Sequence, residues 1–214
     1  MPSHPDPSLH NRHHLYLGDS GSGKSQAVKQ NKGIPNSGAR VLLWDPGLDH
    51  AGTRFTVCSE FAEAVIQSIR SGKGFRVAFT PKRRTVELHE WFCEFVLSVL
   101  DGRHSTYVID EEISRSVNTV SKAPEWFAEL MNEGRKYGLR YHGTTQFPQE
   151  IPKTIYRNCR VIWAGLQDLQ AVTYVATSVG VTPEQISGLK PLEFYVRDKD
   201  HVPPLRREKL VYQR

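Results

Sequence analysis

Cysteine is scarce in this chain, and long hydrophobic runs are absent. The three cysteines, Cys58, Cys93 and Cys159, are far apart, and their odd, sparse number argues against a disulfide framework and fits a reducing compartment. No apolar run approaches the roughly 18–20 residues that a membrane-spanning helix needs. Residues 1–7 lack the apolar centre of a signal peptide. We therefore expect a soluble protein of the cytoplasm without a transmembrane segment.

The chain has only a small excess of positive charge, and it lacks internal repeats and Gly/Ser-rich linkers. The 28 Lys and Arg residues exceed the 23 Asp and Glu residues, which gives a formal charge of +5 and a pI of about 9.1. This excess permits a polyanionic partner without requiring one. Hydrophobic residues make up 38% of the 214 residues, which is enough for a packed core. Without an internal repeat or a Gly/Ser-rich linker, one domain is the economical interpretation.

Short apolar runs alternate with segments of helical periodicity along the whole chain. This alternation predicts an α/β fold with a mostly parallel sheet and helices on both faces. We expect a flexible arm over 1–12, the folded domain over 13–197 and a basic tail over 198–214. The expected strands are 15–17, 40–44, 75–79, 106–109, 139–145, 161–164 and 192–196, and the clearest expected helices cover 61–69, 88–99, 126–137 and 169–179.

One segment matches the phosphate-loop pattern G-x-x-x-x-G-K-[ST] at every fixed position. It follows an expected strand and precedes a helix-compatible stretch, which is the context that this motif requires. Its glycines let the backbone wrap so that N–H groups face phosphates. Lys24 then reaches the terminal phosphates and the Ser25 hydroxyl ligates Mg²⁺. The predicted nucleotide-binding residues are Gly18, Asp19, Ser20, Gly21, Ser22, Gly23, Lys24 and Ser25.

Acidic and amide side chains follow two further expected strands. Asp110 and Glu111 come at the end of the strand that begins at Thr106, at the sheet edge where open α/β folds bind ligands. We interpret Asp110 as the acid on the metal side and Glu111 as the group that polarises the attacking water, with Glu112 as the second candidate for that base. Gln146, after the strand over 139–145, is a candidate sensor of the terminal phosphate.

Together these motifs resemble the FtsK–HerA superfamily of DNA-translocating ATPases, from Leu15 to about Gly165. The most discriminating part is Gly134-Arg135-Lys136-Tyr137-Gly138 followed by Thr145-Gln146-Phe147-Pro148. The resemblance implies a RecA-like sheet in which the Gln146 strand lies between the phosphate-loop and Asp110 strands. It also implies ATP at the interfaces of a hexameric ring around double-stranded DNA. Arg135 matches a candidate arginine finger that reaches a neighbour's ATP, and its rivals are Arg140, Arg157 and Arg160.

Departures from the larger family members narrow the functional expectation. The chain has no transmembrane helices or large added domains, so it resembles genome-packaging ATPases of tailless, internal-membrane viruses. A portal or vertex protein and the viral membrane are then possible partners. Two alternatives stay open, namely a filamentous-phage-type assembly ATPase that exports single-stranded DNA and a small-molecule P-loop kinase. Asp45 and Asp49, which flank Pro46-Gly47, favour the kinase alternative because they suggest a site for the phosphate acceptor.

Basic clusters suggest DNA contacts, although each also fits a solvated charged surface. Lys82-Arg83-Arg84 follows an expected strand, and Arg115 and Lys122 lie in segment 114–122, which we expect to line the channel of a ring. The histidines at 10, 13 and 14 lack companion ligands, so we favour an arm or a subunit contact over a metal site. The tail together with Arg197 just before it carries six basic residues against three acidic ones, namely Arg197, Lys199, Arg206, Arg207, Lys209 and Arg214 against Asp198, Asp200 and Glu208.

Overall fold

A nine-stranded sheet forms the centre of the computed structural model, which describes residues 2–117 and 119–213. The predictions that involve Met1, Asn118 and Arg214 lie outside these residues. The strand order is β3-β4-β2-β5-β6-β1-β7-β8-β9, and all neighbours are parallel except β7–β8 and β8–β9. The strands are β1 His14–Leu17, β2 Arg40–Trp44, β3 Thr53–Phe55, β4 Phe75–Phe79, β5 Thr106–Asp110, β6 Leu139–Thr145, β7 Val161–Ala164, β8 Glu193–Asp198 and β9 Leu205–Lys209.

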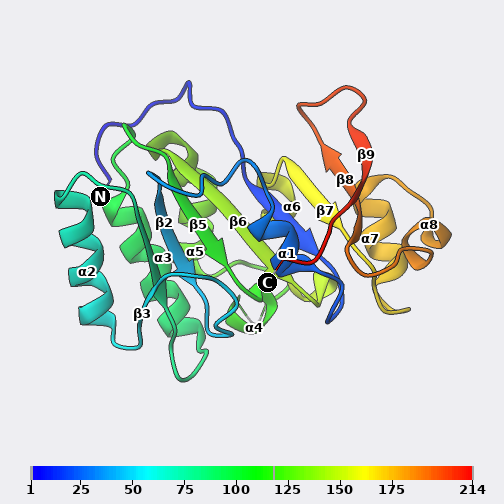
Figure 1. Cartoon of the computed structure of the whole chain (residues 1–214), viewed down its shortest axis with the longest axis horizontal. Helices are drawn as coiled ribbons and strands as arrows, with labels where there is room; N and C mark the ends of the chain where they lie inside the picture. Colours follow the sequence, from blue (N-terminus) through cyan, green and yellow to red (C-terminus); the bar gives the residue numbers. More distant parts are fainter. Residues whose placement is uncertain (1, 118, 214) are drawn as a thin grey trace.

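Helices cover the two faces of this sheet unequally (Figure 1). The larger hydrophobic cluster packs α2, α3, α5, α6 and α7 on one face, and the smaller one packs α1 and the segment after it on the other. Strand residues alternate between the clusters, as the period of a strand requires. The helices are α1 Lys24–Lys29, α2 Cys58–Arg70, α3 Val86–Val99, α4 Ile113–Val117, α5 Glu125–Glu133, α6 Lys153–Asn158, α7 Val172–Val179 and α8 Pro183–Ser187, with short 3₁₀ turns η1 Gly134–Tyr137 and η2 Pro148–Glu150.

The α/β fold with a mostly parallel sheet is therefore confirmed, and so is the predicted neighbourhood of β1. β6 pairs in parallel with both β5 and β1, so the strand that leads to Gln146 lies between the phosphate-loop strand and the Asp110 strand. Asp110 pairs with Gly143, and Leu17 pairs with Thr145. The carboxyl ends of the three strands thus meet at one edge of the sheet, where such folds bind ligands.

Part of the predicted C-terminal tail belongs to the sheet instead of extending from it. β9 pairs antiparallel with β8, from Glu193 opposite Lys209 to Arg197 opposite Leu205. Its basic side chains are largely paired, because Arg206 contacts Glu208 and Arg207 contacts Glu193 at 2.7 and 2.9 Å. The tail was predicted from its charge alone. Pairing with β8 instead places residues 205–209 in a strand.

Two expected helices are shorter than their periodicity suggests. The helix expected over 126–137 gives way to η1 at Gly134, where a Cβ atom would come within 2.6 Å of the Leu139 side chain. The helix expected over 169–179 begins at Val172, because the Asp168 carboxylate accepts the N–H groups of Gln170 and Ala171 at 2.9 Å and stops the turn before it. None of the helices in the described ranges has the length and apolar character to cross a membrane.

His13 and His14 pack within the fold, which differs from the expected arm or subunit contact, whereas His10 is exposed. His13 is fully buried, and its Nδ1 accepts the backbone N–H of Tyr141 at 3.2 Å. His14 begins β1 and stacks on His142 with ring centroids 4.6 Å apart. The chain before them follows the opposite edge of the sheet, where the Asp6 N–H donates to the Lys136 carbonyl at 2.7 Å.

Candidate nucleotide site

The phosphate loop joins β1 to α1 at the carboxyl edge of the sheet. Gly21 and Gly23 have φ values of 74° and 102°, a region that a residue with a side chain enters at a cost. A Cβ atom on Gly23 would also lie 2.7 Å from Cδ2 of Leu192. The loop is fixed at its start by the Gly18 N–H, which donates to the Thr145 carbonyl at 3.3 Å. Glycine is therefore needed at position 23 both for its φ value and for space.

Lys24 folds back across this loop. Its Nζ donates to the carbonyl oxygens of Gly18 and Asp19 at 2.8 and 3.1 Å. Burial lowers the pKa of Lys24, and the nearby carboxylates of Glu112 and Glu111 oppose that shift. The ammonium group is thus held at the loop by neutral carbonyls, with two acids close enough to favour its charge.

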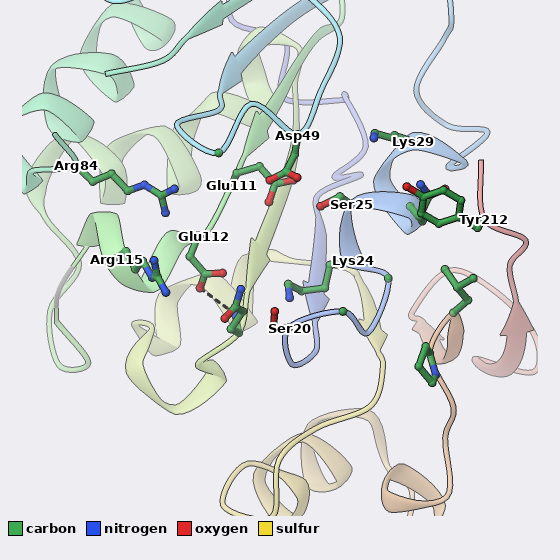
Figure 2. Close-up of a pocket in the computed structure, with 17 residues that line it drawn as sticks. Ser20, Lys24, Ser25, Lys29, Asp49, Arg84, Glu111, Glu112, Arg115 and Tyr212 are labelled. Atoms are coloured by element: carbon green, nitrogen blue, oxygen red, sulfur yellow. Dashed lines mark hydrogen bonds between the residues drawn. The ribbon is translucent and has the colours of Figure 1, made fainter. Parts of the chain in front are cut away.

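A cavity of about 520 Å³ opens between the loop and the ends of the neighbouring strands. Figure 2 shows Glu111 and Glu112 facing Lys24 and Ser25 across it. Of the predicted site residues, Ser20, Gly21, Gly23, Lys24, Ser25, Glu111 and Gln146 line the cavity. The lining also includes Gln26, Lys29, Gly47, Asp49, Arg84, Glu112, Arg115, Pro191, Leu192 and Tyr212.

Glu111 is a buried carboxylate with a partner on each oxygen. Oε1 contacts Nε2 of His50, and Oε2 accepts the Thr144 hydroxyl at 2.6 Å. Burial works against ionisation, but the hydrogen bonds from His50 and Thr144 and the charge of Lys24 outweigh it, so the pKa of Glu111 lies below its ordinary value. Glu111 is therefore a fixed negative charge at the floor of the cavity.

Glu112 is held beside it in the left-handed region, with φ of 60°. A residue with a side chain stays there only where its surroundings fix it. The Glu112 N–H donates to Oγ1 of Thr144 at 3.1 Å, and its Oε1 accepts the Gln146 N–H at 2.9 Å and the Ser114 hydroxyl at 3.0 Å. The first of these acceptor bonds joins the acidic turn to the residue that was predicted as a sensor (Figure 2).

Asp110, the predicted metal ligand, points the other way. Its Oδ2 accepts the Tyr141 hydroxyl at 2.7 Å and meets Nε2 of His89 at 2.9 Å, and the residue is only 1% exposed. Asp110 and Val108 share the core face of β5, whereas Glu111 follows on the other side of the chain. The sequence pattern placed Glu111 and Glu112 at the site, where both line the cavity, but it also placed Asp110 there.

The predicted basic residues divide between the cavity and other parts of the surface. Arg84 and Arg115 line the cavity, although the sequence suggested DNA contacts for both, while Lys82 and Arg83 are exposed. Arg135 lies at the opposite edge of the sheet, where its Nη1 donates to the Pro7 carbonyl at 2.8 Å.

The three rivals for the arginine finger also lie outside the cavity. Arg140 donates to the carbonyl of His10 at 3.1 Å, and Arg160 Nε donates to Asp200 at 2.9 Å. Arg157 is in the last turn of α6.

Sequence reasoning missed the side chains that orient the two acids. Thr144 immediately precedes the Thr145-Gln146 pair, so its place at the end of β6 was a usable signal. His50 comes 61 residues before Glu111, in the loop after β2, and nothing in its local sequence indicates the contact. The loop after β2, the acidic turn after β5 and the end of β6 are far apart in the sequence, and the order of the strands in the sheet brings them to the same cavity.

The donor set fits a magnesium ion at Ser25 and Glu111. Mg²⁺ prefers oxygen ligands and usually takes one or two protein carboxylates together with substrate phosphates and water. A hydroxyl and an ionised carboxylate line the same cavity here. Across residues 2–117 and 119–213, no group of three or more His, Cys, Asp and Glu side chains has a metal-binding arrangement.

Comparisons with known proteins agree with this architecture. The chain is 34% identical over 200 residues to Protein P9 of Pseudoalteromonas phage PM2, covering 90% of this chain and 88% of that protein. The genome packaging NTPase B204 of Sulfolobus turreted icosahedral virus 2, solved with AMPPCP, superposes with a TM-score of 0.74 at 15% identity, covering 95% and 99%. VirB4 of Thermoanaerobacter pseudethanolicus gives 0.62 at 9% identity, covering 94% and 89%. No family model matches the chain.

Proposed function

This chain belongs to the same family as Protein P9 of Pseudoalteromonas phage PM2 and has the RecA-like fold of FtsK–HerA-type ATPases, and from that premise we propose that it hydrolyses ATP to package viral DNA. The observation that carries the proposal is the single cavity that holds the phosphate loop, two carboxylates and Gln146. The similarity to B204, which is named a genome packaging NTPase, supports a role in packaging DNA.

Lys24 and the loop N–H groups bind the triphosphate in this proposal. The Lys24 ammonium exchanges its bonds to the Gly18 and Asp19 carbonyls for phosphate oxygens. Arg84 and Arg115 add positive charge at the cavity wall, where they offset the charge of the phosphates. Because Lys24 is buried, its interaction with an anion is screened little by solvent.

Ser25 and Glu111 hold Mg²⁺ in this proposal, instead of the predicted pair Ser25 and Asp110. Asp110 is engaged in the core with Tyr141 and His89, whereas Glu111 lines the cavity and keeps its charge. Each Glu111 oxygen has a second lone pair beyond its bond to His50 or Thr144. The ion, when bound, supplies positive charge against the phosphate oxygens.

Glu112 then takes the water-activating role first assigned to Glu111. Three hydrogen-bond donors hold its Oε1, namely the Gln146 N–H and the hydroxyls of Ser114 and Thr145, and among residues 2–117 and 119–213 no such bond holds Oε2. Among the acids near Lys24, Glu112 contributes most to raising the lysine pKa, and both side chains line the cavity. Gln146 lines the same cavity and is suited to sense that phosphate.

Double-stranded DNA, a homo-oligomeric ring and a portal or vertex partner are further parts of this proposal. The exposed side chains of Lys82, Arg83 and Lys122 are available for phosphate contacts. The test is phosphate release with no DNA, with duplex DNA and with single-stranded DNA, alongside a native mass measurement. We expect stimulation by duplex DNA in a multimer. Stimulation by single strands alone would favour the exporting alternative, and phosphate transfer to a metabolite would favour the kinase.

A further inference from the structure

The C-terminal segment crosses α1 and reaches the nucleotide cavity at Tyr212. After β9, the Leu210 N–H donates to the Leu192 carbonyl at 2.9 Å, and the Gln30 amide donates to the Val211 carbonyl at 2.8 Å. Gln26 then pairs with the backbone of Gln213 in both directions, at 2.8 and 3.0 Å. In Figure 1 this segment runs from β9 to the side of α1. Side chains of the phosphate-loop helix therefore hold the backbone on both sides of Tyr212.

Tyr212 lines the cavity although 68% of its surface is exposed. Figure 2 shows its ring beside Lys29 and Ser25, on the opposite side of the phosphate loop from Arg84 and Arg115. An exposed aromatic ring at the wall of a cavity, on a backbone fixed before and after it, presents a flat apolar face at little cost in ordering.

Pro191 and Leu192 add apolar lining to the same cavity. Leu192 has a φ of 69°, and its N–H donates to the Ser22 carbonyl at 2.8 Å, so this wall is attached to the phosphate loop itself. Its side chain occupies the space beside Gly23. The cavity thus has a charged part, with Glu111, Glu112 and two arginines, and a part with an aromatic ring and two apolar residues.

We propose that Tyr212 stacks on the base of the bound nucleoside triphosphate, with Pro191 and Leu192 lining the same base subsite. The inference rests on the proposed function, because the phosphate loop fixes where the triphosphate lies. A π-face accepts any base, and the larger ring system of a purine gains more from stacking than a pyrimidine does. The C-terminal segment therefore makes the site a purine-nucleotide site.

The test compares a ligand with a base and one without. We would measure binding of ATP, CTP and inorganic tripolyphosphate to the full chain and to Tyr212→Ala, Tyr212→Phe and Val211→Ala. We expect Tyr212→Ala to weaken ATP binding about tenfold, CTP binding less and tripolyphosphate binding not at all. Tyr212→Phe should bind ATP as the wild type does. Val211 is the matched control, because its exposed side chain is in the same segment but outside the cavity lining.

Two results would overturn the inference while leaving the proposed function intact. One is ATP binding by Tyr212→Ala that equals that of the wild type. The other is an equal loss of ATP and tripolyphosphate binding, which would mean that the segment supports the phosphate loop instead of the base. A wild-type protein that binds neither ligand would overturn the proposed function and this inference together. Thermal unfolding of each variant checks that the fold is retained.

Discussion

At the scale of single residues, the three consecutive acids Asp110, Glu111 and Glu112 have different surroundings, which the sequence alone could not assign. Consecutive side chains of an extended chain alternate in direction, so Asp110 reaches Tyr141 and His89 while Glu111 reaches His50 and Thr144. The positive φ of Glu112 lets a second carboxylate face the cavity directly after the first. The motif was predictable, but the direction of its side chains depends on packing against α3 and β6.

Substitution of each acid tests this division. Glu112→Gln should lower ATP turnover by roughly 10²–10⁴-fold with ATP binding retained, because it removes the base. Glu111→Gln should raise the Mg²⁺ concentration needed for half-maximal turnover. Asp110→Asn should leave the Mg²⁺ requirement unchanged and cost about 1–3 kcal/mol in the free energy of unfolding. Turnover against Mg²⁺ and denaturant unfolding measure these effects.

The opposite result for these variants would contradict the proposed roles of the three acids. An Asp110→Asn variant that needs much more Mg²⁺, beside a Glu112→Gln variant that turns over normally, would restore the roles first predicted from the sequence.

The basic run after β4 provides a second test at the residue scale. Arg84 lines the cavity, whereas Lys82 and Arg83 are exposed. Arg84→Ala should therefore reduce ATP affinity or turnover several-fold without DNA, because it removes positive charge near the phosphates. The pair Lys82→Ala and Arg83→Ala should weaken duplex-DNA binding and its salt dependence while leaving DNA-free turnover unchanged. An Arg84→Ala variant that loses only DNA binding would contradict this division and would indicate that Lys82, Arg83 and Arg84 all contact DNA.

At the scale of elements, the buried strands were the most predictable part. β2, β4 and β7 have the bounds expected from their largely hydrophobic signal, and β6 also has the expected bounds although it carries Arg140, His142 and two threonines. The three-residue β3 and the charged β9 were not found, since neither has such a signal and both depend on a neighbouring strand. Likewise, Tyr212 joins the site through hydrogen bonds from α1 that no local pattern encodes.

Buried histidines on β6 and before β1 predict how stability depends on pH. Burial, together with the nearby charges of His14 and Arg140, lowers the pKa of His13 to about 3 and holds that of His142 well below its ordinary value. Below about pH 6.5 the unfolded chain binds protons at these sites and the folded chain does not, so stability falls as the pH is lowered. Each histidine should cost about 1.4 kcal/mol per pH unit between about pH 6 and 4.

Urea unfolding at a series of pH values measures this slope. His142→Phe should flatten it by about 1.4 kcal/mol per pH unit. His201→Phe is the control, because His201 is exposed and the slope should stay the same. An unchanged slope in His142→Phe would show that other groups drive acid unfolding.

At the scale of the whole molecule, we propose that Arg135 acts on a neighbour's nucleotide, because it lies at the edge of the sheet opposite the cavity of its own subunit. Lys24→Ala and Arg135→Ala should each lose turnover as pure oligomers. Mixing them should restore part of it, because the arginine of a Lys24→Ala subunit can serve the intact phosphate loop of an Arg135→Ala subunit. Turnover against mixing ratio measures the effect, and a mixture without activity, or an active pure Arg135→Ala oligomer, would exclude Arg135 as the finger.

We propose that ATP is hydrolysed in the cavity beside Lys24 and that duplex DNA accelerates the reaction. The most direct measurement is phosphate release by the wild type and by Lys24→Ala, prepared identically, with and without duplex DNA, with Lys32→Ala as a surface control. We predict that duplex DNA increases phosphate release by the wild type and by Lys32→Ala, and that Lys24→Ala gives no release above background. Equal release from Lys24→Ala and the wild type, or no release from the wild type with duplex DNA present, would contradict this proposal.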